Sequence, residues 1–175
     1  AIESLFQHLK YYDKTFTVPR VITVTSDVDY RNKTIVTDTI VLISLDTYLG
    51  TEHHFYEGIQ KFLTQNMKRS QIVSDLAANY SEQYIFQDKP KTLLDDMVYF
   101  GKQLYFKDKM IPFISDAEKI GYTDEQMEWA AANESEIWRY LIERELLFST
   151  DNTLASRFIR TIFGLANSKS LHGKQ

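Results

Sequence analysis

The chain has 175 residues, no cysteine and a formal net charge of −4 at pH 7. The absence of cysteine excludes disulfides, thiolate metal ligands and a cysteine nucleophile from these residues. The acidic balance gives no basic footprint for nucleic acid, so we expect no nucleic-acid partner. The hydrophobic share of 43% suits one domain with a sizeable core, and no run of ~18 apolar residues could span a membrane.

The first part of the chain predicts one helix and then strands. Residues 2–12 carry a helical apolar face formed by Ile2, Leu5, Phe6 and Leu9. Residues 20–26 alternate in the β manner, and residues 34–45 read as a longer strand whose apolar end indicates burial on both faces. Two strands make a marginal sheet, so we expect a third from residues 16–18 or from preceding chain.

The middle of the chain predicts helices. A short helix begins near Gly58, and a longer one, capped by Ser70, runs to Tyr84. A central helix lies within residues 91–112, with Thr92 as its N-cap. Asp95 would reach back to the free N–H groups, and Pro112 would end the helix. Its apolar face has the spacing i, i+3, i+4, i+7 and comprises Leu94, Met97, Val98, Gly101, Leu104 and Tyr105.

The central helix has a glycine, Gly101, in its middle, where glycine is unfavourable. Gly101 costs about 1 kcal/mol relative to alanine in mid-helix. We therefore expect another part of the chain to pack closely against it.

The last part predicts a small helix and then a long one. Residues 115–121 hold a capping box of Ser115 and Glu118 and end in a glycine. The longest helix would run from Thr123 to about Phe148, and Thr123 would cap it in a second capping box with Gln126. Its apolar stripe comprises Met127, Ala130, Ala131, Trp138, Leu141 and Ile142. Glu134 falls within this stripe, where a carboxylate must be paired, protonated or open to a cleft. Strands that precede helices predict an α+β fold.

Residue chemistry alone does not indicate an enzyme. His53 and His54 lie near Glu52 and Glu57 and could bind zinc, but adjacent loop residues seldom both reach one metal. Asp95 could act as an acid or base. Its position at the start of a helix also has a simpler explanation, because the helix dipole stabilises a carboxylate there. The sequence lacks a G-x-S-x-G elbow, a phosphate loop and H-E-x-x-H. We predict no catalytic residue, no metal ligand and no cofactor.

Three blocks of sequence resemble one bacterial family. They read ISLDTYLGTEHHFYEG (43–58), TLLDDMVYFGKQLYFKDKMIP (92–112) and GYTDEQMEWAAANESEIWRYLIERELLFSTD (121–151). Together with SRFI (156–159), they are similar to the gliding-motility lipoprotein GldB family of Bacteroidetes. The resemblance implies one GldB-like domain over residues 1–159 and leaves residues 160–175 as a divergent or flexible tail.

The GldB resemblance implies a process rather than a reaction. It implies an exported lipoprotein of the cell envelope that faces the periplasm and is anchored through a lipid outside this fragment of a longer protein. Its expected partners are other cell-envelope proteins of the gliding-motility and associated secretion machinery.

A weaker resemblance is to zincin-type metallopeptidases, in which one helix carries H-E-x-x-H and the next supplies a third ligand. Here the corresponding positions are residues 78–82, which hold no histidine, and Phe100. The resemblance therefore implies a degenerate zincin-like scaffold, a pseudo-peptidase without its metal.

Three hypotheses follow for function. The first is a non-catalytic binding or scaffold subunit that pairs an extended peptide with a sheet edge. Its cleft would lie beside the helix of residues 72–84 and include Asn79, Glu82, Tyr99 and Glu134.

The second hypothesis is a peptidase-like hydrolase with an unusual site built from Asp95, Glu134 and the His53–His54 pair. The third is a carbohydrate- or peptidoglycan-binding module with an exposed row of Trp129, Tyr56 and Phe55.

Overall fold

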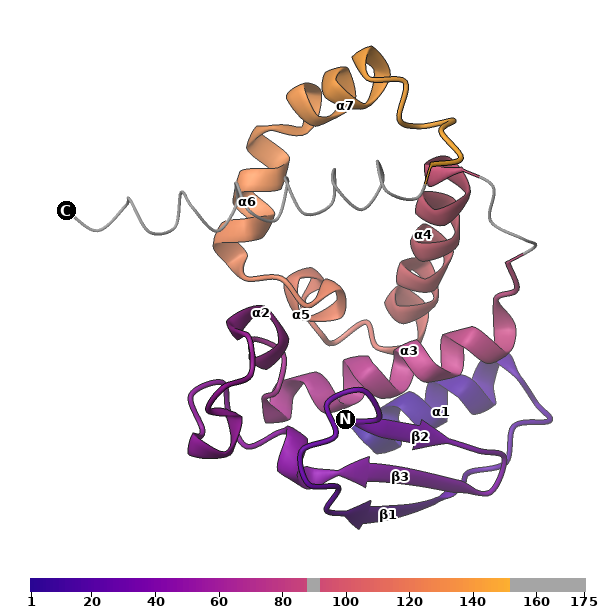
Figure 1. Cartoon of the computed structure of the whole chain (residues 1–175). Helices are drawn as coiled ribbons and strands as arrows, with labels where there is room; N and C mark the ends of the chain where they lie inside the picture. Colours follow the sequence, from indigo (N-terminus) through magenta and orange to yellow (C-terminus); the bar gives the residue numbers. More distant parts are fainter. Residues whose placement is uncertain (88–91, 152–175) are drawn as a thin grey trace. The chain divides into compact units, whose positions relative to one another are not determined.

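The computed structural model describes residues 1–87 and 92–151, which form two compact units (Figure 1). Unit 1 holds residues 1–85 and 103–121. The described part of unit 2 holds residues 86–87, 92–102 and 122–151. The predicted tail of residues 160–175 lies outside the described residues, and the single domain over residues 1–159 stays a prediction.

The sheet of unit 1 has three strands in the order β1-β3-β2. They are β1 (Arg20–Val24), β2 (Thr34–Val36) and β3 (Ile40–Ser44). The central strand β3 runs parallel to β1 and antiparallel to β2. A small mixed sheet followed by helices confirms the predicted α+β class.

The prediction of one long strand over residues 34–45 was wrong. Thr37 turns the chain there: its Oγ1 donates to the carbonyl of Ile40 (2.9 Å) and accepts from the N–H of Ile40 (3.0 Å). The third strand thus arises within this segment and not from residues 16–18. Burial of β3 is also uneven, because Val41 is buried while Ile40 is exposed.

Two helices supply much of the core of unit 1. The apolar face predicted for α1 (Ile2–Tyr12) is confirmed, and α3 (Ile72–Tyr84) adds Val73, Leu76, Ala77 and Tyr80. Ser70 does not cap α3, since a 3₁₀ turn, η3 (Arg69–Gln71), leads into it. The remaining short elements are η1 (Leu45–Thr47), η2 (His54–Tyr56), α2 (Lys61–Thr64) and α5 (Asp116–Ile120).

The central helix is α4 (Leu93–Met110), and its predicted cap is confirmed. The N–H of Asp95 donates to Thr92 Oγ1 (3.3 Å), while Asp95 Oδ2 accepts from the N–H of Thr92 (2.9 Å). The predicted apolar face was wrong, because Val98 and Tyr105 are exposed. The buried residues follow no single i, i+3, i+4, i+7 series, since Leu93 and Met97 join one hydrophobic cluster while Phe106 and Met110 join another.

Gly101 does not mark a close contact. A Cβ added at this position would meet no heavy atom within 4 Å. The expectation that another element packs against it was wrong.

Unit 2 contains two helices where one was predicted. They are α6 (Asp124–Ala132) and α7 (Glu134–Glu143), separated at Asn133, whose side chain bonds back to the carbonyl of Trp129 (2.7 Å). The capping box of Thr123 and Gln126 is confirmed, but the continuous apolar stripe is not, because Ile142 is largely exposed. Within residues 1–87 and 92–151, no helix has the length and apolar character needed to cross a membrane.

Candidate functional site

A polar cluster joins helix α3 to two segments of the sheet region: the residues just before β2 and those after β3. Asp75 of α3 accepts hydrogen bonds through Oδ2 from Lys33 Nζ (2.5 Å) and from the hydroxyl of Tyr48 (2.7 Å). The Lys33 ammonium also lies 5.4 Å from the centre of the Tyr48 ring. Burial, reinforced by the neighbouring Asp75 carboxylate, raises the pKa of Tyr48, so this hydroxyl keeps its proton and remains a donor.

Asn79 lies one turn beyond Asp75 on α3. Its Nδ2 donates to the carbonyl of Thr34 (2.9 Å) and to Thr34 Oγ1 (2.7 Å). These bonds hold α3 against β2 and occupy one outward-facing carbonyl of that strand. Glu82, the second predicted residue on this helix, is exposed.

A second lysine adds to the charge of this cluster. Lys107 of α4 donates from Nζ to Ser74 Oγ (3.1 Å) and to the carbonyl of Lys119 (2.7 Å). Burial lowers the pKa of Lys107; the Asp75 carboxylate counteracts this effect and the Lys33 ammonium adds to it. Asp75 forms its ion pair with Lys33, and its charge also influences the pKa of Lys107.

The other two predicted cleft residues lie in unit 2. Tyr99 is a half-buried residue of α4, with its ring 5.5 Å from that of Phe100. Glu134 is exposed as the first residue of α7, where the helix dipole favours a carboxylate. The interpretation of Glu134 as part of an apolar stripe was therefore wrong. A cleft that joins all four residues stays a prediction.

The histidine pair and the aspartates have local roles. The rings of His53 and His54 stack with centroids 4.4 Å apart, and His53 Nδ1 accepts from the N–H of Phe55 (3.2 Å). Among the described residues, no group of three or more His, Cys, Asp or Glu could hold a metal ion. Asp95 caps α4, as its position predicts, and Asp96 accepts from Gln87 Nε2 (3.0 Å).

The predicted exposed aromatic row is not formed. Tyr56 is buried, where its hydroxyl donates to the carbonyl of Asp46 and accepts from the N–H of Leu49, both at 2.9 Å. Trp129 is half-buried, whereas Phe55 is exposed. Because Tyr56 is buried, the three aromatic residues do not all present the exposed rings that the third hypothesis requires.

The sequence analysis assigned no role to Asp46, the residue directly after the predicted strand of residues 34–45. Asp46 Oδ2 accepts from the N–H groups of Ser26 (2.9 Å) and Val28 (2.8 Å). These bonds hold a turn in which Asp27 and Val28 have φ of 52° and 60°, a left-handed conformation that non-glycine residues seldom adopt. The sequence feature that could have indicated this role is an aspartate directly after an apolar strand.

The outer edge of β1 offers unpaired backbone groups. The N–H of Arg20 donates to the carbonyl of Thr39 beside β3 (2.9 Å), so by alternation the N–H and C=O groups of Val21 and Thr23 point away from β3. Within the described residues, β3 is the strand that pairs with β1, and the side chains of Val21 and Thr23 are exposed. This edge is a template for another extended segment.

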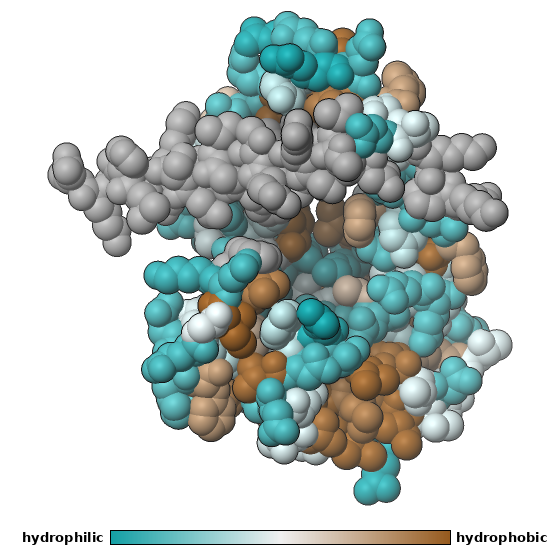
Figure 2. Space-filling view, in the orientation of Figure 1, coloured by the Kyte–Doolittle hydropathy of each residue, from teal (hydrophilic) through white to brown (hydrophobic). Residues whose placement is uncertain are grey.

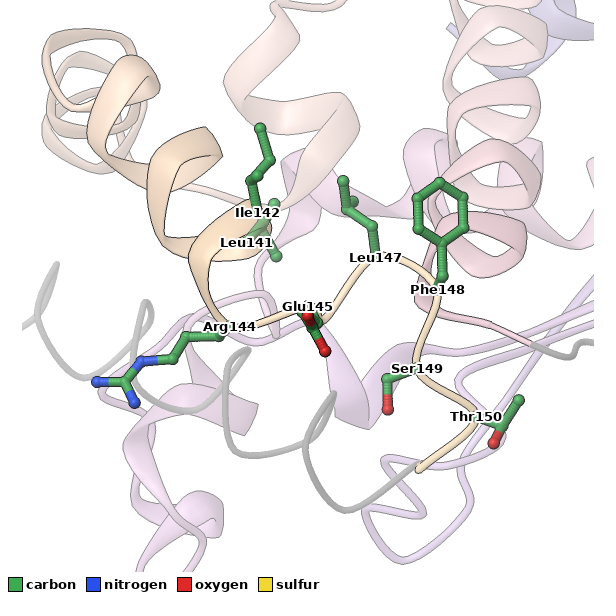
Figure 3. A pocket seen from close by; sticks show the side chains of 8 residues that line it. All are labelled: Leu141, Ile142, Arg144, Glu145, Leu147, Phe148, Ser149 and Thr150. Atoms are coloured by element: carbon green, nitrogen blue, oxygen red, sulfur yellow. The ribbon is translucent and has the colours of Figure 1, made fainter.

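Unit 2 has an open cavity of about 660 Å³ at the end of α7 (Figure 3). Eight residues line it: Leu141, Ile142, Arg144, Glu145, Leu147, Phe148, Ser149 and Thr150. In this view the side chains of Ile142, Leu147 and Phe148 point upward from the chain, whereas those of Arg144 and Glu145 point to the left and down. The aliphatic and aromatic side chains of the lining suit contact with apolar groups.

These features define a class: an α+β protein with a small mixed sheet in which, among the described residues, no strand pairs with the outer edge of β1. The family model for the gliding motility protein GldB matches residues 1–162, and the chain therefore belongs to this family. The family's description makes the chain a gliding-motility protein, and the family's short name marks it as a lipoprotein family. No curated protein and no solved structure matches the chain significantly.

Proposed function

We propose that this protein is a non-catalytic, periplasm-facing subunit of the gliding-motility and associated secretion machinery, lipid-anchored in the cell envelope. Its role is to bind or scaffold other envelope proteins of that machinery. Membership of the GldB family supports the process. The lipid anchor and the periplasmic side follow from the resemblance to exported lipoproteins.

The observation that carries the binding role is the open edge of β1. Val21 and Thr23 present N–H and C=O groups outward, and an extended segment of a partner could pair with both residues. Natural proteins usually blunt such edges with charges, proline or a covering element. Between Val21 and Val24 this strand has no charge and no proline.

The face of the sheet opposite the core indicates what kind of segment would fit. Ile22 and Ile35 both pair with Leu42, so these three side chains form one row across that face. Ile35 is 45% exposed, and Figure 2 shows hydrophobic surface over the strands, in the lower part of the view. A strand added at β1 would extend this row, so its side chains on this face should be aliphatic.

Substitution of Thr23 by proline tests this proposal. Proline removes the outward N–H and obstructs pairing. By alternation, the bonds from β1 to β3 come from Arg20, Ile22 and Val24, so they remain. Thr23→Ala is the matched control, because it removes the side chain and keeps the N–H. We expect cells with Thr23→Pro in the full-length protein to lose gliding at normal protein levels, and cells with Thr23→Ala to glide.

A photo-crosslinking residue at Val21 gives a second readout in the same cells. We expect a conjugate with a motility protein that disappears when Thr23→Pro is added. Normal gliding and an unchanged conjugate in Thr23→Pro would contradict binding at β1. Loss of gliding in Glu82→Ala instead would favour the cleft predicted beside Asn79.

A further inference from the structure

The cavity at the end of α7 has large apolar side chains that remain exposed. Its lining includes Ile142 and Phe148, which are 64% and 73% exposed, and Leu141, which is 1% exposed. Leu141 belongs to the hydrophobic cluster of unit 2, so exposed apolar groups adjoin a packed core. The volume of about 660 Å³ lies within the range of about 300–1,000 Å³ that is typical of binding pockets. Exposed apolar surface of this kind marks a contact site for another molecule.

The turn that forms the cavity has a defined backbone structure. α7 ends in a Schellman motif, in which the N–H of Leu146 donates to the carbonyl of Leu141 (2.9 Å) and that of Glu145 to the carbonyl of Ile142 (3.0 Å). Glu145 takes the left-handed conformation that this motif requires, with φ of 53°. These bonds fix the path of the chain from Ile142 into the following residues, so the wall of the cavity is formed before anything binds.

The backbone groups of this wall are already hydrogen-bonded. The carbonyl of Leu147 accepts from the N–H of Leu94 at the start of α4 (2.9 Å), and the N–H of Ser149 donates to the carbonyl of Leu146 (3.1 Å). An extended partner segment would need a row of outward N–H and C=O groups, as on β1. A helix satisfies its own backbone and presents only side chains, so a helix matches this wall.

The charge of unit 2 indicates the charge of a suitable partner. Its described residues include ten aspartates and glutamates and three lysines and arginines, a formal net charge of −7. Glu145 lines the cavity, Glu143 precedes it on α7, and two aspartates follow Leu94 on α4. Arg144 is the one basic residue among the described residues of the lining. A basic partner is therefore attracted to this surface and an acidic one is repelled.

We propose that the cavity at the end of α7 binds a helix of a partner protein, with large apolar side chains on one face and lysine or arginine beside them. The apolar side chains contact Ile142 and Phe148, and the basic side chains meet the surrounding carboxylates. This site goes beyond the proposed function of β1, because it uses no residue of that strand and takes a helix instead of an extended segment.

The test uses NMR of the full chain with labelled isoleucine methyl groups. The probe is a short acetylated and amidated peptide of leucine and lysine, with leucine spaced to form one helical face. We expect it to shift the methyl signals of Ile142 in a saturable manner. Ile35, an exposed isoleucine of the sheet, is the internal control and should not shift. A peptide with glutamate in place of every lysine should bind about tenfold more weakly or less.

A serine substitution in the lining tests the apolar contact. Phe148→Ser should weaken binding of the lysine peptide about tenfold. Because Phe148 is 73% exposed, the variant should fold normally, and Ile142 signals at their original positions would verify this. Phe55→Ser is the matched control, since Phe55 is an exposed phenylalanine of unit 1, and it should bind the peptide like the unsubstituted protein.

Other occupants of the cavity would give different results. If a second copy of the chain filled it, the Ile142 signals would shift on dilution without peptide. If residues 152–175 of the same chain filled it, Phe158→Ser would tighten binding of the lysine peptide. We expect neither change, and either one would overturn the proposal. Equal affinity for the lysine and glutamate peptides, or equal shifts of Ile142 and Ile35, would overturn it as well.

Discussion

Two buried tyrosines of unit 1 differ in whether the hydroxyl group has a hydrogen-bond partner. The Tyr48 hydroxyl donates to Asp75. Tyr80 is 2% exposed, and its hydroxyl has no partner among the described residues. Burial, with a smaller contribution from Tyr84, raises the pKa of Tyr80 to about 12.

The substitution Tyr80→Phe should stabilise the protein. It removes a buried unpaired hydroxyl, and we expect the free energy of unfolding to rise by about 1 kcal/mol. Tyr48→Phe is the control, because it removes a bond to a charged group and should lower that free energy by about 1.5–3 kcal/mol. Urea unfolding measures both, and destabilisation by Tyr80→Phe would show that the hydroxyl has a partner.

Asp46 makes stability depend on pH. Burial alone would raise its pKa, but the N–H groups of Val28 and Ser26 outweigh that effect, so the pKa in the folded protein lies below the ordinary value. A lowered pKa stabilises the fold above the unfolded value of about 3.9. This contribution is lost as the pH falls through the folded value.

The substitution Asp46→Asn checks this dependence. At pH 7 we expect it to lower the free energy of unfolding by about 1.5–3 kcal/mol, because the bonds from Ser26 and Val28 lose a charged acceptor. The difference between the two proteins should shrink below about pH 4. A difference in urea unfolding that is constant from neutral to acidic pH would contradict the role given to the carboxylate.

At the scale of elements, alanine substitutions at two glycines, one inside a helix and one at a helix end, should change stability in opposite directions. Gly101→Ala in α4 meets open space, so we expect a gain of about 0.5–1 kcal/mol in the free energy of unfolding. Gly121→Ala is the contrasting variant, since Gly121 has φ +84° and an added Cβ would lie 2.6 Å from Asn66 Nδ2. It should destabilise by about 1–2 kcal/mol. Equal effects of both variants in thermal unfolding would refute this contrast.

The sequence predicted elements best where a local signal decides the structure. The capping pairs at Thr92, Ser115 and Thr123 lie where their spacing places them. The splits at Thr37 and Asn133 were missed, because their side chains bond to nearby backbone groups inside otherwise continuous patterns. The buried residues of α4 were predicted wrongly because two separate hydrophobic clusters decide which of its residues are buried. The spacing of apolar residues within the helix does not reveal these clusters.

At the scale of the whole molecule, the GldB family was predicted from sequence blocks, and the family match confirms it. The candidate sites were less predictable. Asn79 was named, but Lys33, Asp75 and Lys107 come from distant segments and look like ordinary surface charges in the sequence. The open edge of β1 depends on the strand order β1-β3-β2, which the spacing of strands along the chain does not determine.

The position of β1 in the sheet also sets an order of folding. β2 and β3 are joined by three residues, so their hairpin is a local structure that forms on a timescale of about 1–10 μs. β1 pairs with β3 across the whole intervening segment and must close a longer loop. We therefore expect β1 to dock last and to detach most easily, so its amide protons should exchange fastest in the sheet and slow down when a partner strand binds.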